Sequence, residues 1–267
     1  MGERICKTKI KTKSKTKTTA TATPKGKTNA PCAPQAVLFD AYGTLFDVYS
    51  VALLAEQLFP GQGQALSLLW RDKQIEYTRL VTTSVDGAHY QPFWELTRAA
   101  LTFAIKKLAP CADSTRASTE FDSKVEQLMN QYRSLSAFPE NRDVLQTLQA
   151  RGVPTGILSN GDVAMLTLAL KSSGLHPYVD HIISVDAVKK YKTHPAAYAL
   201  GESTLGLPAA KVLFVSSNGW DALGATWHGY QTLWVNRSNQ PFEELGTPPT
   251  RIGSSLRDVL GFFPVSL

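Results

Sequence analysis

The sequence lacks the features of several classes of protein. No stretch approaches the roughly 18 consecutive apolar residues that a membrane-spanning helix needs, so we expect no membrane as a partner. Only three of the 267 residues are cysteines, Cys6, Cys32 and Cys111, and this odd, scattered set predicts neither a disulfide framework nor a zinc site. The same pattern favours a cytoplasmic location, where thiols stay reduced.

Outside the first 34 residues the sequence also lacks an excess of basic side chains. Eight lysines, one arginine and one glutamate give residues 1–34 a net charge of +8, so the overall +6 leaves −2 for residues 35–267. A body without basic excess argues against nucleic acid as a partner. Residues 7–28 are rich in Lys and Thr and poor in apolar side chains, so we expect residues 1–34 to be a disordered tail.

From Gln35 onward, short apolar runs alternate with helical patterns. The apolar runs indicate strands that are buried on both faces, at residues 36–39, 153–158, 181–185, 212–215 and 232–235. The helical patterns between the later runs span residues 141–150, 162–173, 195–205 and 221–228. This alternation predicts an α/β fold, with a doubly wound, mostly parallel Rossmann-type sheet of five or six strands and helices on both faces.

One long stretch breaks the alternation. Residues 48–135 contain successive helical patterns and no strand pattern, at residues 48–59, 65–80, 93–108 and 117–135. We expect a helical cap domain at 48–135, inserted into an α/β core made of residues 35–47 and 136–267. Ligands of open α/β sheets bind at the carboxyl ends of the strands, so a cap placed there would close a pocket from water.

Polar side chains follow four of the predicted strands. They are Asp40, the segment Ser159–Asp162, Lys192 and the segment Ser216–Asp221. Strand ends are commonly polar, but the carboxyl ends of parallel strands meet at one edge of a sheet. These four clusters therefore predict a single site.

The motifs at these positions resemble a known family. Residues 39–48, FDAYGTLFDV, resemble the opening motif of the haloacid dehalogenase superfamily, and residues 214–221, FVSSNGWD, are similar to its type II L-2-haloacid dehalogenases. Further similar segments are Leu69–Arg71, Glu76–Thr78, Leu158–Gly161 and Tyr191-Lys192. The resemblance covers about residues 35–260. It implies an enzyme, commonly a homodimer, that converts short (S)-2-haloacids to (R)-2-hydroxyacids through a covalent aspartyl ester.

The resemblance assigns the first half of that reaction to a few residues. Asp40 would attack the carbon that carries the halogen, which forms the ester and inverts that carbon. Arg71 would receive the departing halide with its permanent positive charge, together with Asn160 and the ring edge of Phe93. Tyr90 is the alternative to Phe93, because the segment before Phe93 is longer than in typical members of the family.

The remaining roles concern the substrate carboxylate and the hydrolysis of the ester. Lys192 would lie between Asp40 and the substrate carboxylate and offset the repulsion of two anions. The groups that bind the carboxylate would be the Ser159 side chain and backbone N–H groups near Ala41, Tyr42 and Asn160. Asp221 would orient the hydrolytic water, with help from Ser216 and Asn218. The supporting residues would be Tyr42, Thr44, Tyr198 and Trp220.

Residue 42 separates a dehalogenase from a phosphatase within the superfamily. The phosphatases resemble one another in an Asp-x-Asp opening, whose second carboxylate protonates the leaving group, and they use Mg²⁺. Here the second position is Tyr42, and the segment before Asp221 offers no pair of acids for a hard cation. We therefore predict no metal and no other cofactor. A phosphatase or phosphotransferase is the alternative, and a non-catalytic protein whose basic tail binds nucleic acid or anionic lipid is the third possibility.

Simpler interpretations exist for several of these residues. Arg71, which precedes Asp72, would also suit a solvated helix face, and Asp72 itself departs from the family, where the residue after this Arg is more often neutral. Lys192 would also suit a surface loop, and Asp221 would suit the N-cap of a helix that begins at Ala222. Asp162 is best explained as an N-cap. Two aromatic residues would also fit an ordinary core, Phe93 and Trp220.

Overall fold

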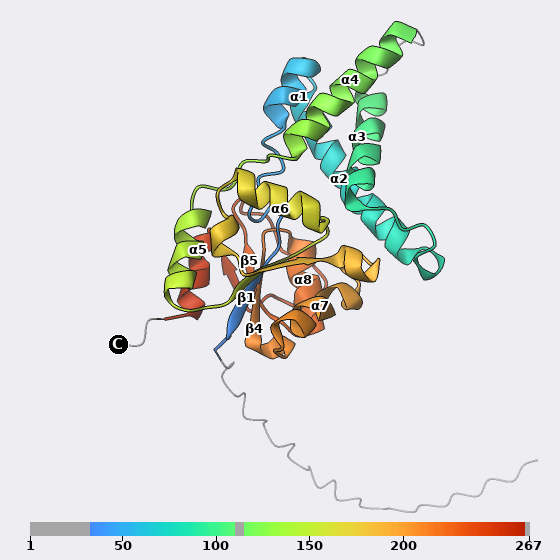
Figure 1. Ribbon diagram of the computed structural model, residues 1–267. Coiled ribbons are helices and arrows are strands. Elements are labelled where there is room, and N and C mark those ends of the chain that lie inside the picture. The colour runs from blue at the N-terminus through green and yellow to red at the C-terminus, as the bar shows by residue number, and fades with distance from the viewer. Residues whose placement is uncertain (1–32, 110–114, 265–267) are drawn as a thin grey trace, which may run out of the picture. The chain divides into compact units, whose positions relative to one another are not determined.

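The computed structural model of the protein describes residues 33–109 and 115–264 (Figure 1). The three cysteines and all but the last two residues of the predicted tail lie outside these ranges. Residues Cys32–Leu267 form one compact unit. Within the described ranges, no helix combines the length and the apolar character that crossing a membrane requires.

A six-stranded sheet lies at the centre of this unit. Its strand order is β3-β2-β1-β4-β5-β6, and every neighbouring pair is parallel. The strands are β1 Ala36–Phe39, β2 Thr155–Ser159, β3 His181–Ser184, β4 Val212–Ser216, β5 Gln231–Val235 and β6 Arg251–Gly253. The predicted α/β fold with a parallel sheet is confirmed. The apolar runs did not predict β6, because it is an edge strand with exposed side chains.

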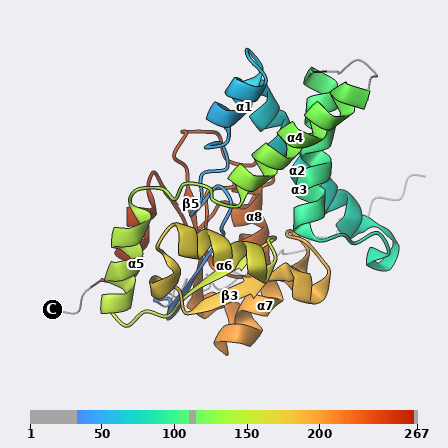
Figure 2. The same cartoon turned by 45° about the horizontal axis from the view of Figure 1, so that its top comes forward.

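Helices cover the sheet on both faces. The helices that alternate with the strands are α5 Asn141–Ala150, α6 Val163–Ser172, α7 Pro195–Leu205 and α8 Gly219–His228. Right-handed crossovers between parallel strands place α5 and α6 on one face and α7 and α8 on the other. In Figure 2, α6 lies in front of the sheet and α8 behind it. Short 3₁₀ helices occur at Val85–Gly87, His176–Tyr178, Val185–Val188, Ala209–Lys211 and Leu256–Phe262.

The helices predicted for the cap follow β1 directly. They are α1 Ala52–Leu58, α2 Gly63–Thr83, α3 Phe93–Leu108 and α4 Thr115–Tyr132. They lie together at one end of the sheet (Figure 1). The ends of α3 are those predicted, and the ends of the other three helices differ from the predicted ends by one to four residues. At α1 and α2 no side chain caps the N-terminus, so the sequence carries no local signal for the start of either helix.

Two chain segments connect these helices to the core, and they pair with each other. Phe46 forms an isolated antiparallel bridge with Ala137, and the Asp47 N–H donates to the Ser136 carbonyl at 2.8 Å. We propose that the cap domain begins and ends at this paired connection, close to the predicted boundaries at residues 48 and 135.

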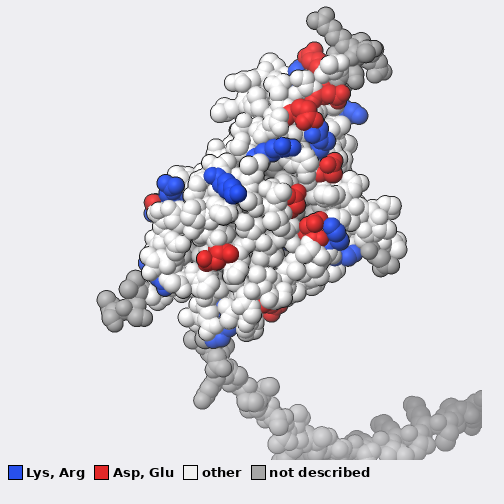
Figure 3. Space-filling view, in the orientation of Figure 1, with Lys and Arg blue, Asp and Glu red and all other residues white. Residues whose placement is uncertain are grey.

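Charges of both signs are interspersed over the surface of the described residues on the face drawn in Figure 3. That distribution agrees with the small net charge of residues 35–267 in the sequence.

Candidate active site

Asp40 follows β1 directly, and the chain turns sharply behind it. The Ala41 carbonyl accepts the N–H of Leu45 at 2.9 Å. Gly43 has a φ of 93°, a left-handed conformation that other residues rarely adopt. The turn brings the Thr44 hydroxyl back to Asp40, where it donates to Oδ2 at 2.9 Å. The sequence therefore needs a glycine at residue 43 to place this hydroxyl.

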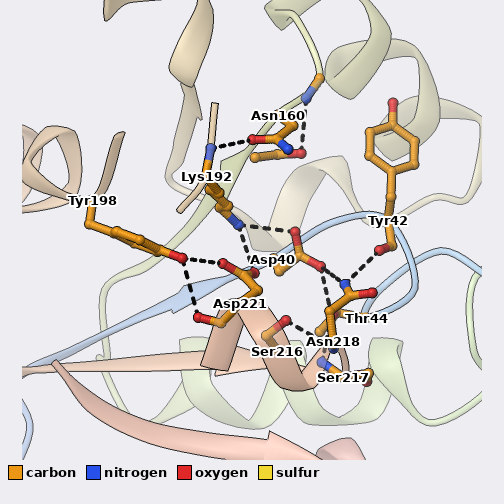
Figure 4. Close-up of polar contacts among 12 residues, drawn as sticks. Asp40, Tyr42, Thr44, Asn160, Lys192, Tyr198, Ser216, Ser217, Asn218 and Asp221 are labelled. Atoms are coloured by element: carbon orange, nitrogen blue, oxygen red, sulfur yellow. Dashed lines mark hydrogen bonds and ion pairs between the residues drawn. The ribbon is translucent and has the colours of Figure 1, made fainter. Parts of the chain in front are cut away.

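Three side chains from different parts of the chain donate to the buried Asp40 carboxylate (Figure 4). Besides Thr44, the Lys192 ammonium donates to Oδ1 at 3.0 Å, and the Asn218 amide donates to Oδ2 at 2.8 Å. A carboxylate held by three donors has a fixed orientation, which a nucleophile needs for in-line attack.

Lys192 is enclosed in the core, with 2% of its surface exposed. Its ammonium lies between two carboxylates, at 3.0 Å from Asp40 Oδ1 and 3.0 Å from Asp221 Oδ2. Burial by itself lowers the pKa of Lys192, but the two carboxylates outweigh burial and raise the pKa above its usual value. The interpretation of Lys192 as a surface lysine is wrong.

Asp221 is fully buried beside Lys192. Burial, with the nearby charge of Asp40, raises the pKa of Asp221 to about 6. The Tyr198 hydroxyl donates to Asp221 Oδ1 at 2.8 Å and so orients the carboxylate. The N-cap interpretation is wrong for this residue, because α8 begins at Gly219 and its N-cap is Asn218. Asp162, in contrast, does cap α6 and accepts the Met165 N–H at 2.8 Å.

The loops after β2 and β4 are held by their own side chains. The Asn160 amide oxygen accepts the backbone N–H of Lys192 at 3.0 Å, which joins two of the predicted clusters. The Ser159 hydroxyl accepts the N–H two residues further on at 3.2 Å. The Ser216 hydroxyl accepts the N–H of Asn218 at 3.1 Å. These serines therefore shape the loops at the strand ends.

Arg71 reaches this site from α2. Its Nη2 donates to the Tyr42 carbonyl at 3.1 Å and to the Asn218 amide oxygen at 3.2 Å. Asn218 therefore contacts both Arg71 and Asp40. The guanidinium lies against the core, so the interpretation of Arg71 as part of a solvated helix face is wrong, although the neighbouring Asp72 is exposed.

The structure distinguishes the two aromatic candidates for contact with the departing halide, Phe93 and Tyr90. Phe93 is buried at the start of α3, and its ring centre lies 5.5 Å from that of Tyr42, which is two residues from Asp40. Tyr90 instead stacks on Tyr191, and its hydroxyl donates to Asp186 at 2.5 Å. This geometry favours Phe93 for the role, which stays a prediction.

Trp220 lies at a cleft rather than in the ordinary core. It is half-buried and, together with Arg71 and Asn218, lines a cleft of about 560 Å³ between α2 and the core. This cleft reaches two residues that contact the Asp40 site, so it offers a route for a small molecule.

Three further polar residues did not stand out in the sequence: Gln74 and Arg237, which contact the site, and Glu140, which pairs with Arg237. Gln74 accepts a hydrogen bond from Arg71, and a signal for it exists: Gln74 continues the buried stripe of Leu66 and Trp70 at a spacing of four. Arg237 donates to the Ser217 hydroxyl at 2.7 Å and to the Thr44 carbonyl, and it pairs with Glu140 at 2.9 Å. Arg237 and Glu140 carry no such local pattern.

The donor set does not resemble a metal centre. Within the described residues, no group of three or more His, Cys, Asp and Glu side chains comes close enough together to hold a metal ion. The position between Asp40 and Asp221, where a cation would fit best, is taken by the Lys192 ammonium.

Comparisons with known proteins agree with this geometry. Residues 34–229 match the family model of the haloacid dehalogenase-like hydrolases. The chain is 40% identical over 229 residues to an (S)-2-haloacid dehalogenase from Pseudomonas sp. strain YL, covering 86% of this chain and 94% of that protein.

Solved structures give the same result. The L-2-haloacid dehalogenase RSc1362 superposes with a TM-score of 0.79 at 53% identity, covering 86% of this chain and 99% of that one. The L-2-haloacid dehalogenase from Xanthobacter autotrophicus, solved with chloropropionic acid covalently bound, superposes with a TM-score of 0.76 at 34% identity, covering 85% of this chain and 96% of that one.

Proposed function

Because the chain belongs to the haloacid dehalogenase-like hydrolase family, we propose that it hydrolyses short (S)-2-haloacids to (R)-2-hydroxyacids. The observation that carries the proposal is the buried Asp40 carboxylate, held by an ammonium and two neutral donors at a strand end. The covalently bound chloropropionic acid in the Xanthobacter autotrophicus relative supports a covalent route.

In the first step, an oxygen of Asp40 attacks carbon 2 of the haloacid from the side opposite the halogen. The new C–O bond forms as the carbon–halogen bond breaks, the halide leaves with the bonding electrons, and the carbon inverts. The substrate carboxylate lies near Lys192, whose positive charge offsets its repulsion from Asp40. Ser159 and the backbone N–H groups near Ala41, Tyr42 and Asn160 are the proposed donors to it.

Arg71 receives the negative charge that develops on the halide. Its guanidinium is permanently charged and weakly hydrated, which suits a large anion in a pocket closed from water. The Asn160 amide and the Phe93 ring edge are the other groups that we propose to contact the halide. Because Arg71 contacts Asn218 and Asn218 contacts Asp40, the halide and the nucleophile are held by adjoining groups.

In the second step, water hydrolyses the ester. Asp221 takes a proton from the water, which attacks the ester carbonyl carbon of Asp40. Oδ2 of Asp40, with donors from Thr44 and Asn218, is suited to be the carbonyl oxygen that gains negative charge. The tetrahedral species collapses to the Asp40 carboxyl group and the alkoxide, which takes the proton from Asp221 and leaves as the hydroxyacid. The second proton of the water passes from the Asp40 carboxyl group to solvent, which restores the carboxylate.

The phosphatase alternative fits the site less well. A phosphatase of this superfamily would need a second acid at residue 42 and a cation beside Asp40. The Tyr42 ring points away from the Asp40 cluster in Figure 4, and an ammonium lies beside the carboxylate instead.

Halide release tests the proposal. The purified protein, treated with EDTA, is given each hand of 2-chloropropionate, and chloride and the chirality of the lactate are measured; p-nitrophenyl phosphate with Mg²⁺ is assayed in parallel. We expect chloride from the (S) acid and (R)-lactate as product. Phosphate release without any halide release would support the phosphatase alternative.

We also propose a homodimer and a cytoplasmic location. The first rests on the resemblance to a family that is commonly dimeric, and the second on the scarcity of cysteine in the sequence. Light scattering coupled to size-exclusion chromatography measures the oligomeric state directly.

A further inference from the structure

Gln74 is a polar side chain buried within the helices α2, α3 and α4, with 1% of its surface exposed. It lies three residues after Arg71 on α2, so the two side chains are neighbours on one helix face. Arg71 Nη1 donates to Gln74 Oε1 at 2.7 Å. Because a guanidinium has only donors, the amide oxygen of Gln74 must face Arg71.

The amide nitrogen of Gln74 is held from the opposite side. It donates to Thr97 Oγ1 on α3 at 2.6 Å and to the Tyr132 hydroxyl on α4 at 3.1 Å. The Thr97 hydroxyl hydrogen is used on the Phe93 carbonyl at 2.7 Å, so Oγ1 is available as an acceptor. These contacts allow one orientation of the amide, and they tie Gln74 to two further helices.

The Arg71 guanidinium is therefore held by hydrogen bonds to a residue of the helical insertion as well as to residues of the core. Its Nη2 contacts the Tyr42 carbonyl and Asn218, and its Nη1 contacts Gln74. An arginine side chain carries much rotamer freedom, and an unanchored guanidinium would sample several positions. We propose that Gln74 is a positioning residue that holds the Arg71 guanidinium where the halide departs. This inference rests on the proposed dehalogenase function.

A purely structural role would also bury Gln74, since a satisfied amide that joins three helices stabilises their packing. The two roles differ in what they change. Loss of packing lowers every rate together, whereas a misplaced Arg71 slows only the step in which halide leaves. The decrease in the rate of ester formation should be larger for a chloro acid than for a bromo acid, because chloride is the poorer leaving group.

The test is Gln74→Met, which keeps the length of the side chain and removes the polar contacts with Arg71, Thr97 and Tyr132. Rapid-quench measurement of halide release gives the rate of ester formation for (S)-2-chloropropionate and (S)-2-bromopropionate. We expect roughly a tenfold or greater loss with the chloro acid, a smaller loss with the bromo acid, and an unchanged rate of ester hydrolysis. Ser67→Ala is the matched control, because Ser67 is also buried on α2 and its hydroxyl donates to the carbonyl of Gly63 on the same helix. Among the described residues it has no hydrogen bond with Arg71, so we expect this variant to leave these rates unchanged.

A double variant tests the connection to Arg71. If Gln74 acts through Arg71, adding Gln74→Met to Arg71→Lys should lower the rate of ester formation by no more than about twofold beyond Arg71→Lys alone. Equal losses with both halogens, or a full multiplicative loss in the double variant, would assign Gln74 to cap stability and overturn the proposal. If Gln74→Met does not fold, Tyr132→Phe removes the hydroxyl that contacts both ends of the Gln74 amide, and it should show the same halogen dependence at smaller size.

Halide binding separates failure of this inference from failure of the proposed function. Titration calorimetry with iodide measures the anion site in the resting protein without turnover. Iodide should bind more weakly to Gln74→Met than to wild type, and Ser67→Ala should match wild type. Wild-type protein that binds iodide but releases no halide from any haloacid would disprove the function and leave the role of Gln74 in holding Arg71 intact. Equal affinities in wild type and Gln74→Met would disprove that role.

Discussion

Inside the core, the Lys192 ammonium lies within hydrogen-bonding distance of two carboxylates, those of Asp40 and Asp221. Two carboxylates and one ammonium leave one negative charge uncompensated, and a haloacid would bring another. Arg71, which reaches the site through Asn218, supplies a second positive charge. With Arg71 in place the four groups sum to zero, so an anionic substrate meets no net repulsion, whereas without Arg71 it would meet one uncompensated negative charge.

Asp40→Asn should abolish turnover and leave the fold intact, because an amide has nearly the same shape but is a poor nucleophile. In wild type, a single turnover in heavy-oxygen water should put the label into Asp40 and not into the product hydroxyl, since water attacks the ester carbonyl. Mass spectrometry of the protein and the product measures both. Label in the product of that single turnover would show that water displaces the halide directly and that Asp40 acts as a base.

Asp221→Asn should separate the two half-reactions. Its loss spares attack by Asp40 but removes the group that takes a proton from water, so the ester accumulates. We expect a burst of about one halide per active site, followed by a stall, and Asp40 should carry the acid fragment of the substrate. Steady release without a burst would exclude this role for Asp221.

The pKa of Asp221 predicts the acidic limb of the activity profile. In the resting protein, burial together with the Asp40 charge raises this pKa to about 6, so the Asp221 carboxylate is present above that pH. In the ester intermediate Asp40 carries no charge, which removes its share of the shift, so Asp221 becomes protonated there at a lower pH. The rate of ester hydrolysis should therefore stay constant above about pH 6 and fall in more acidic solution, while the rate of halide release in the first turnover stays nearly constant. A hydrolysis rate that falls as the pH is lowered from about 8 to 7, or that does not fall at any acidic pH at which the protein stays folded, would contradict this assignment.

Helix α2 is the element of the helical insertion that supplies Arg71 to the Asp40 site. Leu66 and Trp70 bury the first half of its inner face, and Gln74 and Thr78 continue that face with polar side chains. Arg71 projects from the same helix to the core. A helix packed by apolar side chains at one end can therefore present polar groups to a site at the other.

The segment that returns from α4 to the core is held by the pair of Glu140 and Arg237, whose side chains are 13% and 19% exposed. Glu140→Gln should lower the free energy of unfolding by about 1–3 kcal/mol, because it leaves the partly buried Arg237 guanidinium without its carboxylate. The matched control is Asp143→Asn in the exposed pair of Asp143 and Arg257, at 62% and 59%, which should change stability by less than about 0.5 kcal/mol. Urea denaturation measures both, and equal changes would show that burial of the pair is irrelevant.

At the scale of the whole molecule, the site forms where the helical insertion meets the carboxyl ends of the strands. Asp40 follows β1, and Asn160 follows β2. The segment Ser216–Asp221 begins at the last residue of β4, and the helical insertion adds Arg71. The net positive charge of the sequence lies elsewhere, in residues 1–34, which carry +8, whereas residues 35–267 sum to −2.

Deleting residues 1–32 should leave the specific activity and the melting temperature nearly unchanged. Every residue assigned to the site lies after Gln35, and the body keeps its near-neutral charge without this segment. Halide release and thermal unfolding of the two forms measure the effect, at low and at physiological salt because charged segments act more strongly at low salt. A several-fold loss of activity would show that residues 1–32 contribute to the site.

Much of the fold and the main site residues could be predicted from the sequence. Continuous apolar runs such as Ala36–Phe39 indicate strands buried on both faces, and their alternation with helices leads to a parallel sheet. Parallel strands end at one edge, so Asp40, Lys192 and Asp221 were expected to meet. The edge strand β6 escaped prediction because it has only three residues, with a single aliphatic side chain that is itself exposed, and so forms no apolar run.

What the sequence determined by itself was local: which segments are strands or helices, and which chemical groups follow them. Only the tertiary structure decided where the side chains point. Lys192 meets Asp40 across 152 residues, and Arg71 meets Asn218 across 147. No local pattern shows that Asp221 turns to Lys192 rather than capping α8. The physical reason is that side-chain direction depends on the packing of elements far apart in the chain, whereas strand and helix periodicity depends on near neighbours.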